Sequence, residues 1–191
     1  AQPNKEDYLK LYKEVIAPIV NNLDPTRPYL LSSPSNGIET EAEGGISSNP
    51  SNPRYGDIHF YNEAKNLWRD ESYQTPRCTT EYGLQSLPSG QTMSRYLPQS
   101  DYHYLSGNYT HRQHHPGGIE SLIYMIFSHF PLPQSCSNLN QDGRIDSKDL
   151  EECTKNSDFI DRHAYFTQFH QALTYKTETE HYIRYRNLLT E

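Results

Sequence analysis

The chain has 191 residues, a formal net charge of −7, 34% hydrophobic residues and 21% charged residues. This length predicts one domain or at most two, and the composition is globular rather than disordered. The negative charge and the lack of a long basic run argue against nucleic acid or anionic lipid as a partner. No run approaches the roughly 18 apolar residues that a membrane span needs. We therefore expect neither nucleic-acid binding nor membrane insertion.

Apolar periodicity predicts helices and short strands along the chain. Residues 6–23 have the i, i+3, i+4 spacing of an amphipathic helix, which Pro18 should bend near its end. Apolar runs predict three short strands, at residues 29–33, 57–61 and 77–82. Further helices are predicted at 62–68, 119–130 and 158–189. Short buried strands with helical connectors favour a parallel sheet covered by helices.

The third predicted strand ends in the stretch TTEYGLQS, which places Glu81 before Tyr82 and Gly83. In α/β proteins, an acid followed by a glycine turn is how a catalytic group is presented at the carboxyl edge of the sheet. An exposed Glu without a function at a strand end gives the same pattern. The octapeptide by itself leaves both interpretations open.

Six blocks in the same order carry a resemblance to a known family. They are RPYLLSSPSNG, GDIHFY, TEYGLQSLPS, HRQHHPGG, LPQS and KTETEHY. Together they resemble the animal β-mannosidases of the lysosomal type, in glycoside hydrolase family 2, which also holds β-galactosidases and β-glucuronidases. The resemblance covers nearly the whole chain, apart from an insert at about residues 136–157. It implies that residues 1–191 are part of one catalytic domain, an α/β fold that is a partial (β/α)8 TIM barrel containing about strands five to seven.

The resemblance also implies a retaining glycosidase with two carboxyl groups about 5 Å apart. Its nucleophile follows the seventh barrel strand in a Glu-Tyr/Phe-Gly context, which falls on Glu81. The family's acid/base Glu lies in an Asn-Glu pair after the fourth strand, upstream of this chain, and the pair at Asn62 and Glu63 does not fit that place. We therefore expect this chain alone to be inactive, with the acid/base supplied by the remainder of the same polypeptide or by another chain that completes the barrel.

The implied substrate is a terminal β-D-mannoside of an oligosaccharide or glycoprotein. His59 and Tyr61 lie at alternate positions of one strand and should face the same way. The candidate sugar contacts are His59, Tyr61, Tyr82 and Trp68, the single Trp of the chain. The alternative role is packing inside the barrel for His59 and Tyr61, and packing in the core for Trp68. No organic cofactor is expected.

The insert contains NLNQDGRIDSKD, which has the register of a calcium loop of the EF-hand type. Gly143 holds the sixth position, where the loop turns sharply. The oxygen donors would be Asn138, Asn140, Asp142, the Arg144 carbonyl, Asp146 and Asp149. Asn at the first place and Asp at the twelfth are closer to dockerin loops than to calcium sensors, which predicts weak binding of structural Ca²⁺. A polar Asn/Asp/Gly turn without an ion is the alternative.

Three cysteines and one sequon favour the secretory pathway, with a lysosomal or secreted location. Cys136 and Cys153 bracket the predicted calcium loop, and a disulfide between them would add about 3 kcal/mol in the entropic account. Cys78 would then be unpaired and buried in the barrel wall. Asn108 begins the sequence NYT, an acceptor for N-glycosylation. The alternative function is a non-catalytic secreted glycoprotein, derived from a β-mannosidase and stabilised by calcium.

Overall fold

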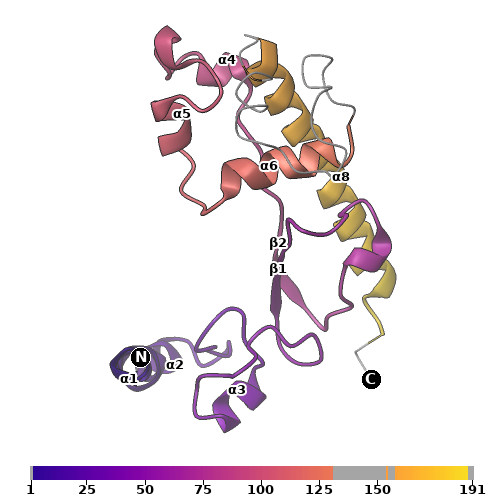
Figure 1. Cartoon of the computed structure of the whole chain (residues 1–191). Coiled ribbons are helices and arrows are strands. Elements are labelled where there is room, and N and C mark those ends of the chain that lie inside the picture. The colour runs from indigo at the N-terminus through magenta and orange to yellow at the C-terminus, as the bar shows by residue number, and fades with distance from the viewer. Residues whose placement is uncertain (1, 131–153, 155–157, 189–191) are drawn as a thin grey trace. The chain divides into compact units, whose positions relative to one another are not determined.

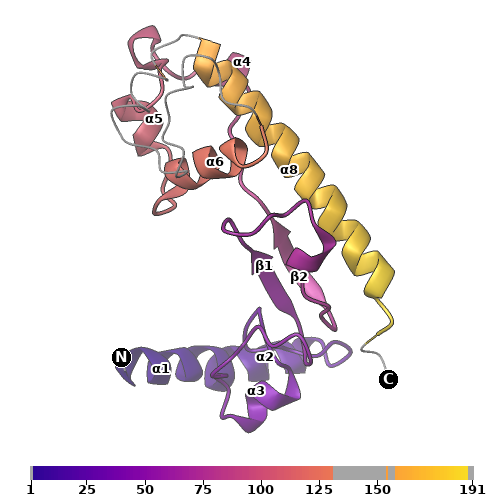
Figure 2. The ribbon, with the colours of Figure 1, turned by 45° about the vertical axis from the view of Figure 1, so that its right-hand side comes forward.

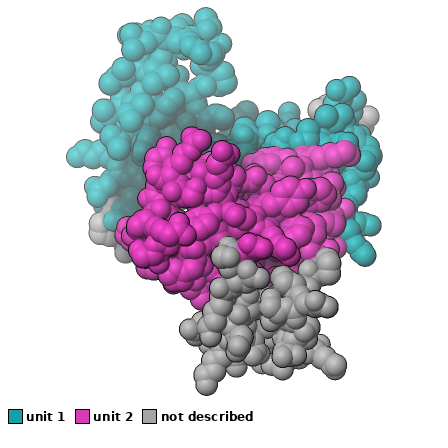
Figure 3. Space-filling view, turned by 90° about the horizontal axis from the view of Figure 1, so that it is seen from above, with its two compact units in different colours: residues 1–61, 69–83, 178–191 teal, residues 62–68, 84–177 magenta. Residues whose placement is uncertain are grey.

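The computed structural model describes residues 2–130, 154 and 158–188. These residues divide into two compact units, which Figure 3 colours separately. Unit 1 contains residues 1–61, 69–83 and 178–191, and unit 2 contains residues 62–68 and 84–177. Each unit is described below by itself.

Unit 1 begins with a helical run made of α1 (Gln2–Leu9), the π-helical segment η1 (Lys10–Ile16) and α2 (Ala17–Leu23). The predicted helix over 6–23 is therefore confirmed, and Figure 2 shows the run as one rod. Pro18 lies in the first turn of α2, directly after the wider π-helical turns. Since proline has no N–H to donate, a wider turn before it accommodates the missing hydrogen bond.

The predicted strand over residues 29–33 is wrong. The segment is irregular, with bends at residues 31–33, and the nearest bridge is at Ser35, antiparallel to Asp57. Pro28 and Pro34 flank the segment and have no N–H for a ladder, and the Leu31 carbonyl accepts a hydrogen bond from the Tyr8 hydroxyl. The backbone of this segment is therefore held by local contacts rather than by a sheet. The short helix α3 (Ile38–Ala42) follows this segment.

Two parallel strands form the sheet of unit 1 (Figure 1). They are β1 (Ile58–Tyr61) and β2 (Thr79–Gly83), which confirms the predicted strands at 57–61 and 77–82. Ile58 and Phe60 are buried on one face, and the Phe60 ring packs 5.5 Å from the ring of Tyr73. The alternate residues of β1 are therefore turned to the opposite face.

The predicted helix at 62–68 is also wrong. Asn62 Oδ1 accepts hydrogen bonds from the backbone N–H groups of Ala64 and Lys65, and Asn66 Oδ1 accepts one from Trp68. Asn side chains that bind the backbone in this way compete with helix formation. The 3-10 turn η2 (Asp70–Ser72) follows in unit 1.

Unit 2 is helical in the part of the chain that the structure describes. Its short elements are α4 (Gly90–Met93), the 3-10 turn η3 (Gln99–Asp101) and α5 (Gly107–His111). The longer helices α6 (Gly118–Phe127) and α8 (Asp158–Tyr185) confirm the last two predicted helices, and residues 178–185 of α8 belong to unit 1. The core of unit 2 gathers Met93, Leu97, Tyr104, Tyr109, Ile119, Ile123, Phe159, Ile160 and Ala164.

No helix within the described ranges is both long and apolar enough to cross a membrane. The longest, α8, has 28 residues, and charged side chains lie toward both of its ends.

Candidate active site

A bulge in β2 builds the polar face of the sheet. Ile58 pairs with Thr79 but His59 pairs with Glu81, so Thr80 is an extra residue on β2. Consecutive residues of a regular strand face opposite sides, whereas a bulge lets both turn to one side. Thr80 and Glu81 accordingly both contact side chains of the β1 segment, through Asp57 and His59 respectively.

Glu81 lies beside two polar side chains of β1. The Tyr61 hydroxyl donates a hydrogen bond to Glu81 Oε2 over 3.3 Å, and His59 Nδ1 lies 3.4 Å from the same oxygen. The Glu81 side chain is 54% exposed, so its second oxygen has room to meet a ligand. The structure therefore brings together three of the predicted site residues, which come from neighbouring positions of two strands.

Gly83 ends this strand with a φ of 145°, a backbone conformation that glycine adopts far more readily than other residues. The backbone conformation at this position therefore explains the glycine of the Glu-Tyr-Gly sequence. The Glu81 carboxylate lies at the end of the polar face, just before the chain leaves the sheet.

Asp57 anchors a hydrogen-bond network next to His59. Its buried carboxylate accepts from the Ser33 hydroxyl and the Thr80 hydroxyl, each over 2.7 Å, and from the Ser35 N–H over 2.7 Å. Burial acts to raise the pKa of Asp57, but the hydrogen bonds outweigh it and hold the pKa below its ordinary value. With its lone pairs engaged in this way, Asp57 is a structural anion rather than a second catalytic acid.

Ser33 connects this anchor to His59. The Ser33 Oγ lies 2.8 Å from His59 Nε2, while His59 Nε2 itself is 3.9 Å from Asp57 Oδ2. The backbone around Ser35 approaches Gly56 closely. A Cβ added to Gly56 would lie 2.0 Å from the Ser35 carbonyl oxygen. Gly56 is thus required for the chain segment that carries Ser33 to reach the sheet.

The other two predicted sugar contacts lie elsewhere. Tyr82 is turned away from Glu81, with its hydroxyl 2.9 Å from Thr179 Oγ1 and its ring 5.2 Å from that of Tyr182. Trp68 belongs to unit 2, where its indole N–H donates to His170 Nδ1 over 2.7 Å and its ring stacks on His129 at 4.0 Å. The substrate-binding roles of Tyr82 and Trp68 remain predictions.

The predicted modification and metal sites fall partly inside the described residues. Asn108 is exposed on α5, where its amide contacts Asp101. Cys78 is an exposed free thiol, so the expectation that it is buried is wrong. Cys136, Cys153 and the calcium loop at 138–149 lie outside the described residues. Within the described ranges, no group of three or more His, Cys, Asp or Glu side chains could hold a metal ion.

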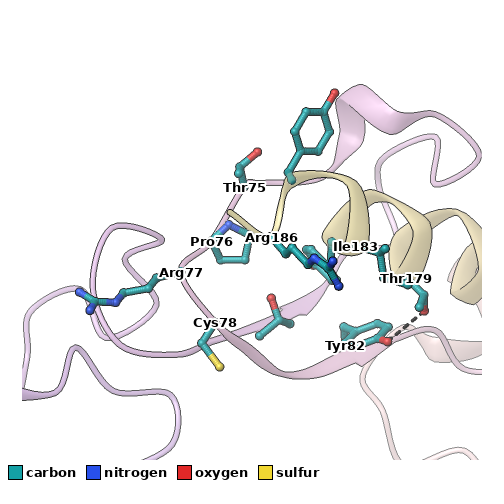
Figure 4. A pocket seen from close by; sticks show the side chains of 11 residues that line it. Thr75, Pro76, Arg77, Cys78, Tyr82, Thr179, Ile183 and Arg186 are labelled. Atoms are coloured by element: carbon teal, nitrogen blue, oxygen red, sulfur yellow. Dashed lines mark hydrogen bonds between the residues drawn. The ribbon is translucent and has the colours of Figure 1, made fainter. Parts of the chain in front are cut away.

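A separate cavity of about 300 Å³ lies in unit 1, between the start of β2 and the end of α8 (Figure 4). Tyr82 and Thr179 line it and share the hydrogen bond described above. Arg77 and Arg186 also border it, and none of its described lining residues is a carboxylate. This cavity therefore lacks the acids that glycoside hydrolysis requires.

Sequence analysis missed Ser33, Asp57 and Thr80. Asp57 had a signal, because it precedes His59 and Tyr61 at alternate positions of an otherwise apolar strand. Ser33 had none, since its role depends on the fold of a segment that was predicted as a strand. Thr80 depends on the bulge.

Comparison with known proteins places this geometry in a family context. The chain is 48% identical over 187 residues to a probable beta-mannosidase of Caenorhabditis elegans, and 38% identical over 186 residues to a beta-mannosidase of Mus musculus. Each match covers 97% of the chain. The chain is homologous to animal β-mannosidases. It spans about one fifth of their length, with 20% of the nematode protein and 19% of the mouse protein covered.

Structural comparison concerns the fold of the chain. The crystal structure of a beta-D-mannosidase from Dictyoglomus thermophilum superposes with a TM-score of 0.63 at 23% identity, over 90% of this chain and 17% of that one. This likeness supports a mixed α/β fold. None of the protein-family profiles compared with the chain matches it.

Proposed function

We propose that the protein carrying this chain is a retaining exo-β-mannosidase, which hydrolyses terminal β-D-mannose from oligosaccharides or glycoproteins. The observation that carries the proposal is the contact of Glu81 with both His59 and Tyr61 on the neighbouring strand, in a segment homologous to β-mannosidases. An exposed carboxylate with a hydroxyl donor and a histidine ring beside it suits a nucleophile, because these neighbours can orient it.

In this mechanism Glu81 attacks the anomeric carbon as the bond to the leaving oxygen breaks, and a glycosyl ester forms. A second carboxyl group, in the part of the protein outside this chain, protonates the leaving oxygen and then activates the water that hydrolyses the ester. Asp57 does not fit that second role, since it is buried and accepts hydrogen bonds from three groups. His59 and Tyr61 orient Glu81 and border the sugar.

The surrounding architecture is part of the same proposal. β1 and β2 would be two neighbouring parallel strands of a partial (β/α)8 barrel, with Glu81 at a carboxyl edge, where barrel enzymes place their catalytic residues. The remainder of the polypeptide, or another chain, would complete this barrel. The protein would be lysosomal or secreted, glycosylated at Asn108, with a Cys136–Cys153 disulfide and a calcium loop over residues 138–149.

Stereochemistry tests the proposal directly. The full protein is incubated with 4-nitrophenyl β-D-mannoside, and the first-formed sugar is observed by ¹H NMR before it mutarotates. We expect β-D-mannose as the first product, and slower cleavage of the matching β-D-glucoside and β-D-galactoside. Release of α-D-mannose would contradict the retaining mechanism. Failure to cleave the mannoside would favour a non-catalytic glycoprotein.

A further inference from the structure

The hydrogen bonds around His59 determine where its ring protons lie. Ser33 has one hydroxyl proton and three neighbours within hydrogen-bond distance, of which Asp57 Oδ2 at 2.7 Å and His59 Nε2 at 2.8 Å are nearer than Thr80 Oγ1 at 3.4 Å. The ionised Asp57 carboxylate can only accept, so the Ser33 proton points to Asp57. The other short contact of Ser33 then requires a proton on His59 Nε2, donated to the Ser33 oxygen.

The opposite arrangement is unfavourable. If Ser33 donated to His59 instead, its oxygen and Asp57 Oδ2 would be two acceptors 2.7 Å apart with no proton between them. Thr80 cannot relieve this contact, because its own proton is already directed to Asp57 Oδ2 over 2.7 Å. The hydrogen-bond network around Asp57 therefore selects a single tautomer of His59.

This tautomer has a consequence on the other side of the ring. With Nε2 protonated, neutral His59 would turn the lone pair of Nδ1 toward Glu81 Oε2 at 3.4 Å. The contact between this lone pair and the Glu81 carboxylate is repulsive. A second proton, on Nδ1, makes the ring a cation and turns the contact into an ion pair. The charged and titratable groups around the ring are Asp57 on one side and Glu81 on the other, with Tyr61 bound to Glu81.

We propose that Ser33 and Asp57 are positioning residues that fix one proton on His59 Nε2, and that the ring carries a second proton on Nδ1, which it donates to ionised Glu81. The catalytic meaning of this arrangement rests on the proposed function. The Nδ1–H keeps the attacking oxygen aligned in the first step. It also stabilises the carboxylate charge that returns to Glu81 when the glycosyl ester is hydrolysed. His59 transfers no proton in either step, since the leaving oxygen receives its proton from the second carboxyl group.

Neutron diffraction of the full protein, crystallised near neutral pH in deuterated solvent, tests the arrangement by locating the deuterons. We expect density on His59 Nε2 directed at Ser33, and on Ser33 Oγ directed at Asp57. We also expect one deuteron between His59 Nδ1 and Glu81. An unprotonated Nε2, or no deuteron between Nδ1 and Glu81, would overturn the proposal.

The positioning role is tested by the rate at which a 2-deoxy-2-fluoro-β-mannosyl fluoride labels the protein. Ser33→Ala removes the acceptor of the Nε2–H, so the doubly protonated ring loses a partner and is no longer fixed against Glu81, and we expect labelling to slow roughly tenfold. The matched control is Ser32→Ala, which removes a neighbouring hydroxyl that donates to the Pro34 carbonyl over 2.9 Å. Equal rates for Ser33→Ala and wild type would contradict the role. If the wild-type protein takes no label, the proposed function fails, whereas the neutron density still decides the proton positions.

Discussion

The Tyr61 hydroxyl reaches across from β1 to donate a hydrogen bond to Glu81 Oε2 on β2 over 3.3 Å. Tyr61 itself is paired with Gly83 in the sheet register, two residues beyond Glu81. The contact is therefore diagonal, and it exists because the bulge at Thr80 brings Glu81 opposite His59. One backbone irregularity thus assembles the two neighbours of the proposed nucleophile.

Removing this hydroxyl should slow hydrolysis. Tyr61→Phe deletes the donor to Glu81 and keeps the ring, and hydrogen bonds to charged groups contribute about 1.5–3 kcal/mol. We expect kcat for 4-nitrophenyl β-D-mannoside to fall roughly tenfold or more, as measured by steady-state kinetics of the full protein. Tyr55→Phe is the control, since Tyr55 is exposed and lies outside both strands. An unchanged kcat in Tyr61→Phe would mean that the hydroxyl does not assist Glu81.

Glu178 should make the protein less stable as the pH rises. Its side chain is fully buried, Oε1 accepts from the Tyr182 hydroxyl over 2.8 Å, and Oε2 has no partner. Burial raises the pKa of Glu178 to about 7, although the Tyr182 hydrogen bond opposes the change. Between pH 4.5 and about 7 the unfolded chain ionises this group while the folded chain keeps it neutral, so stability is lost as the pH rises through that range.

Urea unfolding at pH 5 and pH 8 checks this expectation. From pH 5 to pH 8, the free energy of unfolding of the wild-type protein should fall by on the order of 2 kcal/mol more than that of Glu178→Gln. This variant keeps the shape of the side chain but cannot ionise. The control is Glu180→Gln, at an exposed position of the same helix, and it should behave as wild type. Identical pH dependence in wild type and Glu178→Gln would show that this carboxyl does not titrate between the two states.

His181 should be needed for the stability of unit 1. It is buried, and its two ring nitrogens face acceptors, with Nδ1 3.0 Å from Asp70 Oδ1 and Nε2 3.0 Å from the Gln74 carbonyl oxygen. His181→Phe keeps a ring there but removes both hydrogen bonds. We expect the free energy of unfolding to fall by about 2–4 kcal/mol, because a carboxylate loses a charge-assisted partner.

Thermal unfolding of His181→Phe checks this expectation. The control is the same exchange at an exposed histidine. His103 lies on the surface, so His103→Phe should change the midpoint temperature of unfolding little. If the two variants unfold at the same temperature, the contacts of His181 with Asp70 and Gln74 contribute nothing measurable.

Calcium should stabilise the protein if residues 138–149 bind it. With a Kd on the order of 1 mM, 10 mM Ca²⁺ should raise the free energy of unfolding by about 1.4 kcal/mol through linkage. Asp142→Ala removes the predicted ligand at the fifth position of the loop and should abolish the increase, whereas Asp7→Ala, at an exposed position of α1, should retain it. An equal response to Mg²⁺, or a full response in Asp142→Ala, would contradict the site.

The sequence predicted the elements whose character is local. The paired strands around His59 and Glu81 have apolar residues and a glycine terminus of their own, and α6 and α8 have long helical patterns, so each was identified from its own residues. Residues 29–33 have the same apolar character but no ladder in the structure, because a strand also requires a partner with free N–H and C=O groups. Strand formation there depends on contacts that the local sequence does not encode.

The chemical groups of the site were predictable from the sequence, but the residues that hold them in place were not. Glu81, His59 and Tyr61 followed from strand alternation and family resemblance, and the structure places them in contact. Ser33 reaches His59 from 26 residues away along the chain, through a segment whose bends no periodicity reveals. Hydrogen-bond partners distant in sequence therefore required the fold.

Trapping of the nucleophile tests the central claim most directly. The full protein is incubated with 2-deoxy-2-fluoro-β-mannosyl fluoride, and intact mass and peptide mapping locate the sugar. Glu81→Gln is the loss variant, and Glu39→Gln, at an exposed position of α3, is its control. We expect one fluorosugar on the peptide containing Glu81 in wild type and Glu39→Gln, and none in Glu81→Gln. A label on another carboxylate, or an unlabelled wild-type protein, would contradict the assignment of Glu81 as the nucleophile of a retaining β-mannosidase.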